Sequence, residues 1–331
     1  MIFLSCCMLD ADLRVNREKI LAAPGHEISK YLLQSVPPTD MDLTVRFSNG
    51  VVSPQIFLGT YRIKSEAEVE TAVTAALSLG YRGLDTASVY RNHNKIATTL
   101  AEVLPRLGLT RPDIFITSKL APLDHGTDKC RAAIEKILRD LNTDYLDLFL
   151  IHWPGVQKLD VQDPMNRKLR LESWRVLEEC YRRGVLRSIG VSNYTTRHLT
   201  ELLGHCEVVP HVLQTELHPH YQQRSLVQLC DKNKIHVQAY SSLGQAGPQG
   251  PLFSSPVVTE ICKSLGKSPA QILLKWGLMN GYTVMPKSVH PERIKENVDL
   301  NFTFEEKHLN LLNGLELEIS EKYTWNPESI L

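Results

Sequence analysis

The sequence predicts a closed (β/α)8 TIM barrel, with a β-hairpin before it and an irregular tail after it. The first observation is a recurring unit in which a short apolar run, a polar break and an amphipathic helical stretch follow one another. The second is that the runs are apolar almost throughout, as parallel strands buried on both faces are. The third is that polar residues stand at the C-terminal end of nearly every run, where barrels carry their active sites.

The unit recurs eight times along the chain. The predicted strands cover residues 56–60, 81–87, 113–120, 145–153, 186–193, 208–216, 235–242 and 282–288. An open doubly wound sheet is the alternative, but no G-x-G-x-x-G sequence follows the early strands. In an open doubly wound sheet the polar residues would also gather at one crevice, whereas in this sequence they follow nearly every strand. Both differences favour the barrel.

Helix limits are legible between several of these strands. The stretch from Ser65 to Gly80 carries acidic residues in its first turn and a glycine after its last, as helix ends prefer. Ser268 is placed as an N-cap, with Pro269 at the first helical position and Gln271 completing a capping box. These signals predict two well-defined outer helices.

The segments at either end of the chain are expected to lie outside the strand-helix repeat. Residues 1–42 have weak periodicity and predict an N-terminal extension with at most one short helix, near Glu18 to Ala23. Residues 43–331 predict the barrel domain, which opens with a hairpin around Asn49-Gly50. Residues 305–331 predict one more helix and an irregular tail that folds over the barrel mouth.

Composition narrows the class of protein. The chain has 331 residues with 37 basic and 37 acidic side chains, so its overall charge favours neither nucleic acid nor an anionic membrane surface. Seven cysteines are odd in number and show no metal-ligand spacing, which indicates a reducing cytosol and no metal site. No run reaches membrane-spanning length, and the opening residues lack a basic region and a cleavage site. We therefore expect a cytoplasmic protein.

Four residues around the strand ends form a chemically coherent group. They are Asp85, Tyr90, Lys119 and His152. A tyrosine phenol has an ordinary pKa near ~10, and a neighbouring ammonium such as that of Lys119 would lower it. A buried Lys119 needs a carboxylate partner, which Asp85 can supply. His152 can position and polarise a carbonyl oxygen, so the group predicts general acid catalysis with Tyr90 as the acid.

Each member of the group also has a simpler explanation. Asp85 and Lys119 can be a structural ion pair, and His152 can be a strand-end histidine with its hydrogen bonds satisfied. Lys119 has a rival chemical role as the Schiff-base nucleophile of an aldolase. The argument for catalysis is that four suitable residue types meet at one rim.

Seven stretches of the sequence are together similar to the signatures of a known superfamily. The stretches "GYRGLDTASVYRN", "ITSKL", "YLDLFLIHWPG", "IGVSNY", "VLQTELHP", "QAYSSLG" and "MPKSVHPERIKEN" resemble those of the aldo-keto reductases, in the same order, from about Leu43 onward. The resemblance implies a barrel that binds NADPH and reduces aldehydes or ketones to alcohols by hydride transfer. It also implies that the protein is a monomer whose partner is a small-molecule carbonyl substrate.

The resemblance assigns roles to individual positions. It makes Tyr90 the proton donor, tuned by Asp85 and Lys119, with His152 orienting the carbonyl. It implies that Tyr240 stacks on the nicotinamide ring. The remaining implied contacts to the NADPH cofactor come from Thr60, Ser192, Asn193, Gln214, Ser241, Leu243, Lys287, Ser288, Arg293, Glu296 and Asn297. Two cations and a hydroxyl around Lys287, Ser288 and Arg293 also suit the 2′-phosphate on chemical grounds, so NADPH is expected over NADH.

The chain departs from the family pattern at two kinds of position. His93 stands where a glutamate is common; we expect it to be neutral and packed near a helix start, and the alternative is that it adjusts the potential near Tyr90. Tyr61 and Trp153 match aromatic residues that wall the substrate pocket, whereas Ala121 replaces a frequent tryptophan. The connections after Pro154 and after Gly244 are also shorter than in steroid-acting members of the family. Together these features predict an open pocket for small aldehydes, dicarbonyls or open-chain sugar-like carbonyls.

Three other functions remain open from the residues. A barrel of this kind can bind NADPH without useful turnover, as the β subunits that resemble this family do when they regulate potassium channels. Reduction of carbon-carbon double bonds accompanies a glutamate at the position of His152, and the histidine disfavours it. A Schiff-base aldolase using Lys119 would need no NADPH.

Overall fold

The fold is a barrel of parallel strands. The computed structural model describes residues 43–244 and 250–331. Eight strands, β3 to β10, pair in chain order and in parallel, and a bridge between Ile56 and Val284 joins the first to the last. The predicted barrel is confirmed. The strands are β3 (Phe57–Gly59), β4 (Gly83–Asp85), β5 (Phe115–Leu120), β6 (Leu148–Ile151), β7 (Ile189–Ser192), β8 (Val212–Glu216), β9 (His236–Tyr240) and β10 (Thr283–Val284).

The strands are shorter than the sequence predicts, at both their N-terminal and C-terminal ends. The last predicted strand, 282–288, contributes only Thr283 and Val284 to the sheet. Lys287 and Ser288 follow it as irregular chain. The hydrogen-bonded ladder ends where the polar residues begin, and the chain then turns along the rim of the barrel. The residues at the rim are therefore held by short loops that start from rigid strands.

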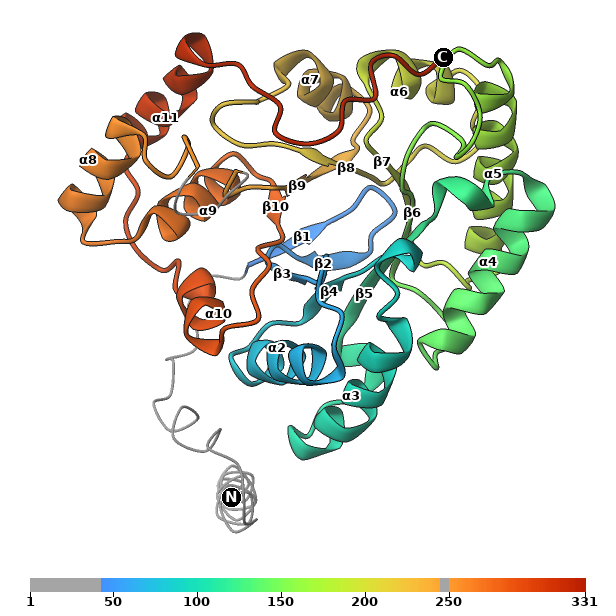
Figure 1. Ribbon diagram of the computed structural model, residues 1–331, viewed down its shortest axis with the longest axis horizontal. Coiled ribbons are helices and arrows are strands. Elements are labelled where there is room, and N and C mark those ends of the chain that lie inside the picture. The colour runs from blue at the N-terminus through green and yellow to red at the C-terminus, as the bar shows by residue number, and fades with distance from the viewer. Residues whose placement is uncertain (1–42, 245–249) are drawn as a thin grey trace, which may run out of the picture.

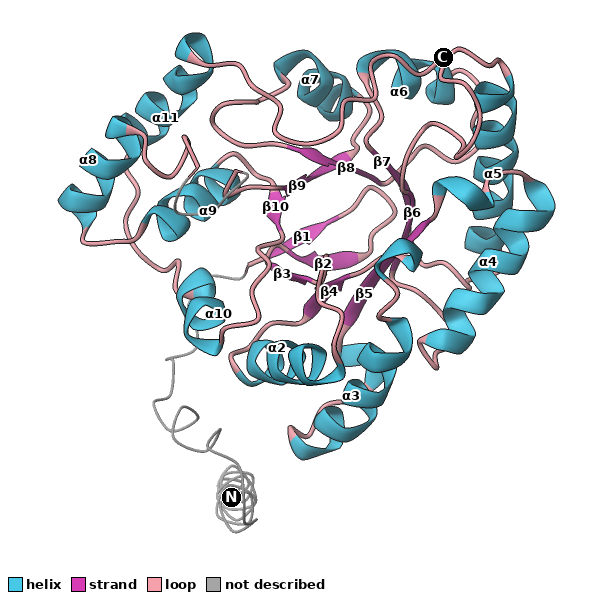
Figure 2. Ribbon diagram, viewed as in Figure 1, coloured by secondary structure: helices cyan, strands magenta, loops and turns pink. Residues whose placement is uncertain are grey.

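Helices form the outer ring around the strands (Figures 1 and 2). Ser65 caps the first of them in a capping box with Glu68, and Ser268 does the same with Gln271. Both predicted N-terminal helix limits are therefore confirmed. The helices are α2 (Glu66–Ser78), α3 (His93–Arg106), α4 (Thr127–Asp140), α5 (Met165–Arg182), α6 (Thr196–Leu203), α7 (Arg224–Lys232), α8 (Pro256–Leu265), α9 (Pro269–Met279), α10 (Pro291–Val298) and α11 (Glu306–Glu318), with short 3-10 turns η2 (Ser88–Tyr90), η3 (Arg111–Asp113) and η4 (Pro122–Asp124).

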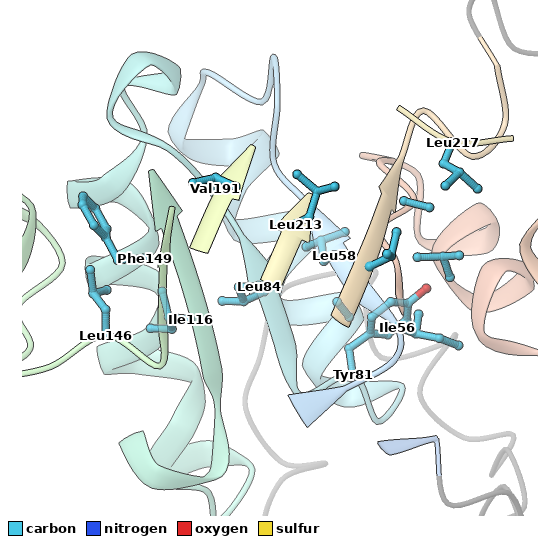
Figure 3. Close-up of a cluster of buried hydrophobic side chains, with 14 of the residues drawn as sticks. Ile56, Leu58, Tyr81, Leu84, Ile116, Leu146, Phe149, Val191, Leu213 and Leu217 are labelled. Atoms are coloured by element: carbon cyan, nitrogen blue, oxygen red, sulfur yellow. The ribbon is translucent and has the colours of Figure 1, made fainter. Parts of the chain in front are cut away.

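The main hydrophobic core lies between the strands and the helices. Figure 3 shows part of it, including Leu58, Leu84, Ile116 and Phe149, each with at most 1% of its surface exposed. A side chain of this kind contributes about 1.5–3 kcal/mol when it is fully buried. This layer fixes the strands against the helices and so fixes the rim that they carry.

A two-stranded hairpin closes the N-terminal end of the barrel. Strands β1 (Thr44–Arg46) and β2 (Val52–Pro54) pair antiparallel around the Asn49-Gly50 turn, as predicted. Phe47 in this hairpin packs edge-on against Phe115 at 6.1 Å between ring centroids, and Phe57 packs edge-on against Phe115 at 5.5 Å. The rings of Phe47, Phe57 and Phe115 form an aromatic plug at this end of the barrel. Gly83 leaves room for the plug, because a Cβ there would lie 2.6 Å from the Phe57 ring. The opposite end of the barrel is left for polar residues.

Two further features concern the ends of the chain and its class. The predicted extension, residues 1–42 with its short helix, lies outside the described residues. The predicted final helix is α11, and residues 319–331 follow it as an irregular tail across the barrel end (Figure 1). No described helix has the length and apolarity needed to cross a membrane. The described cysteines, which are Cys130, Cys180, Cys206, Cys230 and Cys262, are free thiols.

Candidate active site

The four predicted catalytic residues meet at the C-terminal end of the barrel. Asp85 ends β4, Lys119 is the last residue but one of β5, and His152 follows β6. Tyr90 ends the short turn η2, which follows β4 and brings the phenol back over the opening. Four separate segments therefore deliver these side chains to one place, because parallel strands end on the same rim.

Lys119 is the centre of this group. Its side chain is fully buried, and its Nζ lies 2.6 Å from Asp85 Oδ1. Nζ also donates to the carbonyl oxygen of Thr86 at 3.0 Å and approaches the Tyr90 hydroxyl at 3.5 Å. Burial lowers the pKa of Lys119, and the pairing with Asp85 opposes that shift. The predicted ion pair is confirmed, and it aims a cation at the phenol oxygen.

The pKa of Tyr90 differs from the expectation. Burial raises the pKa of Tyr90 well above its usual value, and the charge of Asp85 raises it further. Burial and the charge of Asp85 therefore outweigh the expected lowering by Lys119, although its Nζ lies 3.5 Å from the phenol oxygen. In this state Tyr90 keeps its proton at neutral pH, as a proton donor must before it reacts.

His152 lies beside the phenol in its neutral form. The rings of Tyr90 and His152 pack edge-on with centroids 5.8 Å apart. Burial lowers the pKa of His152 to about 3, and the Lys119 cation contributes to the shift. The buried Nδ1 of His152 has no hydrogen-bond partner among the described residues. A neutral imidazole beside a phenol can donate one hydrogen bond to a small polar group in the opening.

Four predicted cofactor residues line one side of the same opening. Gln214 is buried and donates from Nε2 to Asp85 Oδ2 at 2.8 Å. Asn193 donates from Nδ2 to the carbonyl oxygen of His152 at 2.9 Å and to Ser192 Oγ at 3.2 Å. The Tyr240 hydroxyl donates to Asn193 Oδ1 at 2.6 Å. The structure thus links these amides directly to the four-residue group.

Two residues on this side have a left-handed backbone conformation. Asn193 follows β7 with φ 63° and Ser241 follows β9 with φ 51°, so both adopt the left-handed conformation. Residues other than glycine adopt it at a cost of order 1–3 kcal/mol, and functional sites are where such strain gathers. Thr60, which follows β3, is buried and donates from Oγ1 to the carbonyl oxygen of Asp85 at 2.9 Å. Leu243 lies three residues beyond the end of β9.

The predicted phosphate residues form a separate cluster after β10. Ser288 is buried, and its Oγ accepts from the backbone amide of His290 at 3.0 Å, just before α10 begins. Lys287 and Arg293 are exposed, and neither makes an ion pair within the described part of the chain. Glu296 and Asn297 lie in the last turn and a half of α10. A helix N-terminus with two uncommitted cations is a favourable place for a phosphate.

The predicted substrate residues stand at the opening. Tyr61 is 45% exposed, and its ring lies 5.1 Å from that of Tyr90. Trp153 follows His152, and its carbonyl oxygen is held by His125 Nε2 at 2.9 Å. Both aromatic residues thus border the residues that carry the chemistry.

His93 is buried and neutral, as expected. It is the first residue of α3, and its Nε2 lies 3.1 Å from Ser118 Oγ. Burial lowers the pKa of His93 to about 4. The neutral ring thus contacts Ser118, the strand residue next to Lys119.

Two residues of the site were missed in the sequence. Asn92 is buried, accepts from Thr86 Oγ1 at 2.7 Å and donates to the carbonyl oxygens of Thr60 and Ile63 at 3.1 and 3.2 Å. Asn92 therefore connects two loops at the rim. Its position two residues after Tyr90 was the one feature of the sequence that could have indicated a role in the site. Glu216 is the last residue of the predicted strand 208–216 and was given no role, although it is fully buried and binds the C-terminal tail. No group of His, Cys, Asp or Glu side chains suited to a metal ion occurs in residues 43–244 and 250–331.

Comparison with known proteins identifies the family. The model of the aldo/keto reductase family matches residues 55–250. A glyoxal reductase of Bacillus subtilis is 37% identical over 295 residues, which is 89% of this chain and 99% of that protein. The chain belongs to the aldo-keto reductase family. Human aldo-keto reductase family 1 member A1 is also 37% identical, over 82% of this chain and 88% of that protein.

Solved structures agree with this family assignment. MGS-M4, an aldo-keto reductase from a Medee basin deep-sea metagenome library, superposes with a TM-score of 0.78 at 32% identity, over 87% of this chain and 99% of the other. The aldose reductase of Schistosoma japonicum gives a TM-score of 0.75 at 35% identity, over 85% and 94%. The protein is therefore an oxidoreductase of small carbonyl compounds, in a family that uses a nicotinamide cofactor.

Proposed function

We propose that this aldo-keto reductase reduces aldehydes and ketones to alcohols with NADPH, using Tyr90 as the proton donor. The observation that carries the proposal is the buried Lys119–Asp85 pair, with Nζ at 2.6 Å from the carboxylate and 3.5 Å from the Tyr90 hydroxyl. A surface ion pair would serve no such purpose, and burying one costs several kcal/mol per charge. A charge aligned with a protonated phenol gives a catalytic reason to retain a pair that lowers stability.

The cofactor residues fit NADPH by the chemistry of their donors. Ser192, Asn193 and Gln214 offer the hydroxyl and amide groups that suit a carboxamide, and Tyr240 offers a ring face. The uncommitted Lys287 and Arg293, with Ser288 at the start of α10, suit a dianionic 2′-phosphate. Thr60, Ser241, Leu243, Glu296 and Asn297 would complete the contacts. When bound, the reduced nicotinamide supplies the hydride.

The chain's own residues then deliver the proton and hold the substrate. His152, neutral because burial lowers its pKa to about 3, donates a hydrogen bond that orients the carbonyl oxygen. Tyr90 gives its proton to the same oxygen, and Lys119 at 3.5 Å stabilises the phenolate that remains. Asp85 keeps Lys119 charged inside the barrel. Tyr61 and Trp153 border the position of the substrate carbon.

The substrate class is that of small aldehydes, dicarbonyls and open-chain sugar-like carbonyls. Ala121 lies between β5 and η4, and its small side chain supports this range because many members of the family have a tryptophan at this position. The relatives named glyoxal reductase and aldose reductase are consistent with this range. We also propose a cytoplasmic location, because the described cysteines are free and several are buried. The proposal that the protein is a monomer rests on the family alone.

The test is an initial-rate survey with NADPH and NADH over small aldehydes, dicarbonyls, sugars and steroids. We expect turnover with NADPH, a higher KM for NADH, and the best kcat/KM for the small dicarbonyls and aldehydes. Tight NADPH binding without turnover would replace the proposal by a binding role. Trapping of substrate on Lys119 by borohydride without NADPH would replace it by aldolase chemistry.

A further inference from the structure

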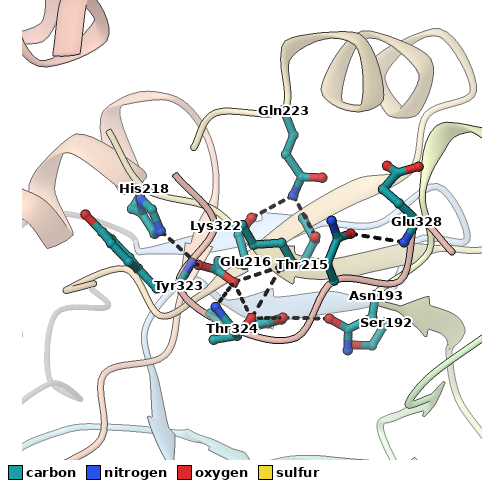
Figure 4. A network of polar contacts seen from close by, with 12 residues as sticks. Ser192, Asn193, Thr215, Glu216, His218, Gln223, Lys322, Tyr323, Thr324 and Glu328 are labelled. Atoms are coloured by element: carbon teal, nitrogen blue, oxygen red, sulfur yellow. Dashed lines mark hydrogen bonds and ion pairs between the residues drawn. The ribbon is translucent and has the colours of Figure 1, made fainter. Parts of the chain in front are cut away.

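The C-terminal tail, residues 319–331, is held at the barrel mouth by one buried carboxylate. Glu216 ends β8, and its side chain is fully buried. It accepts hydrogen bonds from Lys322 Nζ at 2.8 Å and from the backbone amides of Tyr323 and Thr324 at 2.5 and 3.0 Å. The Thr324 hydroxyl also donates to it, and His218 Nε2 lies 3.1 Å from its other oxygen (Figure 4).

The tail is what keeps this carboxylate satisfied. Burial alone would raise the pKa of Glu216, but the hydrogen bonds from His218, Lys322 and Thr324 and the Lys322 cation lower it to about 2. Glu216 is therefore ionised in any ordinary buffer. A buried charge left without its partners costs about 3–5 kcal/mol, so the position of residues 322–324 is strongly fixed.

The tail is also fixed on both sides of Thr324. The Tyr323 ring stacks on the His218 ring with centroids 4.8 Å apart, and its hydroxyl lies 2.7 Å from His220 Nδ1. Further on, Ile330 is buried, and its carbonyl oxygen lies 2.9 Å from His198 Nε2. The position of the Thr324 hydroxyl is therefore fixed by the contacts on both sides of it.

That hydroxyl reaches the proposed nicotinamide site. Thr324 Oγ1 lies 3.1 Å from the Tyr240 hydroxyl, which donates to Asn193 Oδ1 at 2.6 Å. Because the Thr324 hydrogen is directed at Glu216, the Thr324 oxygen accepts from Tyr240, whose single hydrogen is shared between Asn193 Oδ1 and Thr324 Oγ1. Asn193 in turn donates to the carbonyl oxygen of His152 at 2.9 Å. One chain of hydrogen bonds therefore runs from the tail to the catalytic rim.

We propose that Thr324, oriented by Glu216, is a positioning residue for the cofactor: it fixes Tyr240 and, through Tyr240, the amide of Asn193. The proposal rests on the proposed function, in which these two residues contact the nicotinamide. A tail that only stabilised the fold would need Glu216 and its donors but no contact with Tyr240. Losing the Thr324 hydroxyl should therefore weaken NADPH binding more than it slows the bound complex.

The experiment measures the NADPH Kd by fluorescence titration, together with kcat at saturating NADPH. Thr324→Val keeps the shape but removes the hydroxyl, and we expect the Kd to rise roughly three- to tenfold, the effect of one neutral hydrogen bond. We expect kcat to change less than about twofold. Thr324→Ser should restore the wild-type Kd, and Thr303→Val, the same change at an exposed threonine, should leave it unchanged.

A double-mutant cycle with Tyr240→Phe separates positioning from general stabilisation. If Thr324 acts through the Tyr240 hydroxyl, Thr324→Val should have no further effect on the Kd once that hydroxyl is gone. Additive losses, or a Thr324→Val protein that binds NADPH like the wild type, would overturn this inference and leave the proposed function standing. A wild-type protein that fails to bind NADPH would overturn both.

Discussion

At the N-terminal end of the barrel the rings of Phe47, Phe57 and Phe115 fill the interior, whereas at the C-terminal end the interior holds the charges of Lys119 and Asp85. The aromatic plug has only packing to optimise, and hydrophobic burial stabilises it. The charged end loses solvation energy and keeps unpaired polar atoms such as His152 Nδ1. The contrast teaches that one end of this barrel maintains the fold, and that the other carries the chemistry at the expense of stability.

Two buried carboxylates, Asp147 and Asp85, make the same contrast on a smaller scale. At the N-terminal end, Asp147 accepts from Arg111 at 2.8 Å and Arg187 at 3.4 Å, and its Oδ2 also accepts the backbone amide of Ile116 at 2.9 Å. This carboxylate faces two cations, which are themselves partly exposed. At the other end, Lys119 is fully buried and its single carboxylate partner is Asp85. The contacts of Asp147 suit stability, whereas the pairing of Asp85 with Lys119 keeps a cation available to Tyr90.

Removing the Lys119 cation should have the largest effect on activity. We expect Lys119→Met to lower kcat/KM by at least about 100-fold, because the phenolate formed on Tyr90 loses its stabilising charge. Arg111→Met, the matched change at the other end, should lower the unfolding free energy but leave kcat/KM within about twofold. Thermal melts and initial rates on both variants measure the two effects. Equal losses of activity would erase the distinction between the ends.

Where Lys119→Met folds poorly, Lys119→Met combined with Asp85→Asn removes the buried unpaired carboxylate. This double variant should recover a cooperative melt without recovering activity. Recovery of activity along with stability would mean that the pair has only a structural role.

Truncating the plug should give the converse result. Phe47 is 3% exposed, and Phe47→Ala should cost about 3–5 kcal/mol of unfolding free energy through the cavity that it leaves. Because the plug lies at the end of the barrel away from Tyr90, kcat/KM of the folded fraction should be unchanged. Denaturant titration followed by rates at low temperature would check this. A fall in kcat/KM that matched the loss of stability would show that the two ends are coupled.

A smaller effect is expected at the proposed phosphate site. Arg293→Met should raise the KM for NADPH about 10- to 100-fold, since a charged hydrogen bond contributes about 1.5–3 kcal/mol, and should leave the KM for NADH unchanged. Lys295→Met removes the same charge from the last turn of α10 and serves as the control. An equal rise in KM for both cofactors in Arg293→Met would argue against a 2′-phosphate at this position.

The smallest effect is expected at His93. Burial lowers the pKa of His93 to about 4 and that of His152 to about 3, so both take up protons only as the pH falls below about 5. The kcat/KM of the wild type should therefore be free of a histidine ionisation between pH 5 and 9. His93→Asn, which keeps a polar group toward Ser118, should give a superimposable profile. An inflection near pH 6.5 that His93→Asn removed would revive the electrostatic role.

The sequence was most informative where the pattern follows from backbone geometry. Apolar runs and capping residues such as Ser65 and Ser268 predicted the barrel and its helix starts, because they depend on local periodicity and local hydrogen bonds. The pairing of Asp85 with Lys119 was predictable because strand order brings successive rims together. By contrast, the raised pKa of Tyr90 depends on how completely the folded chain buries the phenol and on how near the Asp85 charge lies. The periodicity of apolar residues along the sequence predicts neither the burial of the phenol nor the distance to a charge.

The contact of the tail with the rim was beyond the sequence for the same reason. Glu216 and Thr324 are more than a hundred residues apart, and no motif links them. Only the path of residues 319–331 over the mouth brings them together. A role for Asn92 was easier to predict, because it stands two residues after Tyr90. Its partners Thr60 and Ile63 come from another loop, so its contacts could not be predicted.

The most direct test of the central claim is a single-turnover measurement on Tyr90→Phe with NADPH already bound. A small dicarbonyl is mixed with the wild type and with the variant, and loss of NADPH absorbance is followed. We expect the variant to bind NADPH within about threefold of the wild type and to transfer hydride on the order of 10²–10⁴ times more slowly, the usual contribution of a general acid. Hydride transfer at the wild-type rate in Tyr90→Phe would contradict the assignment of Tyr90 as the proton donor.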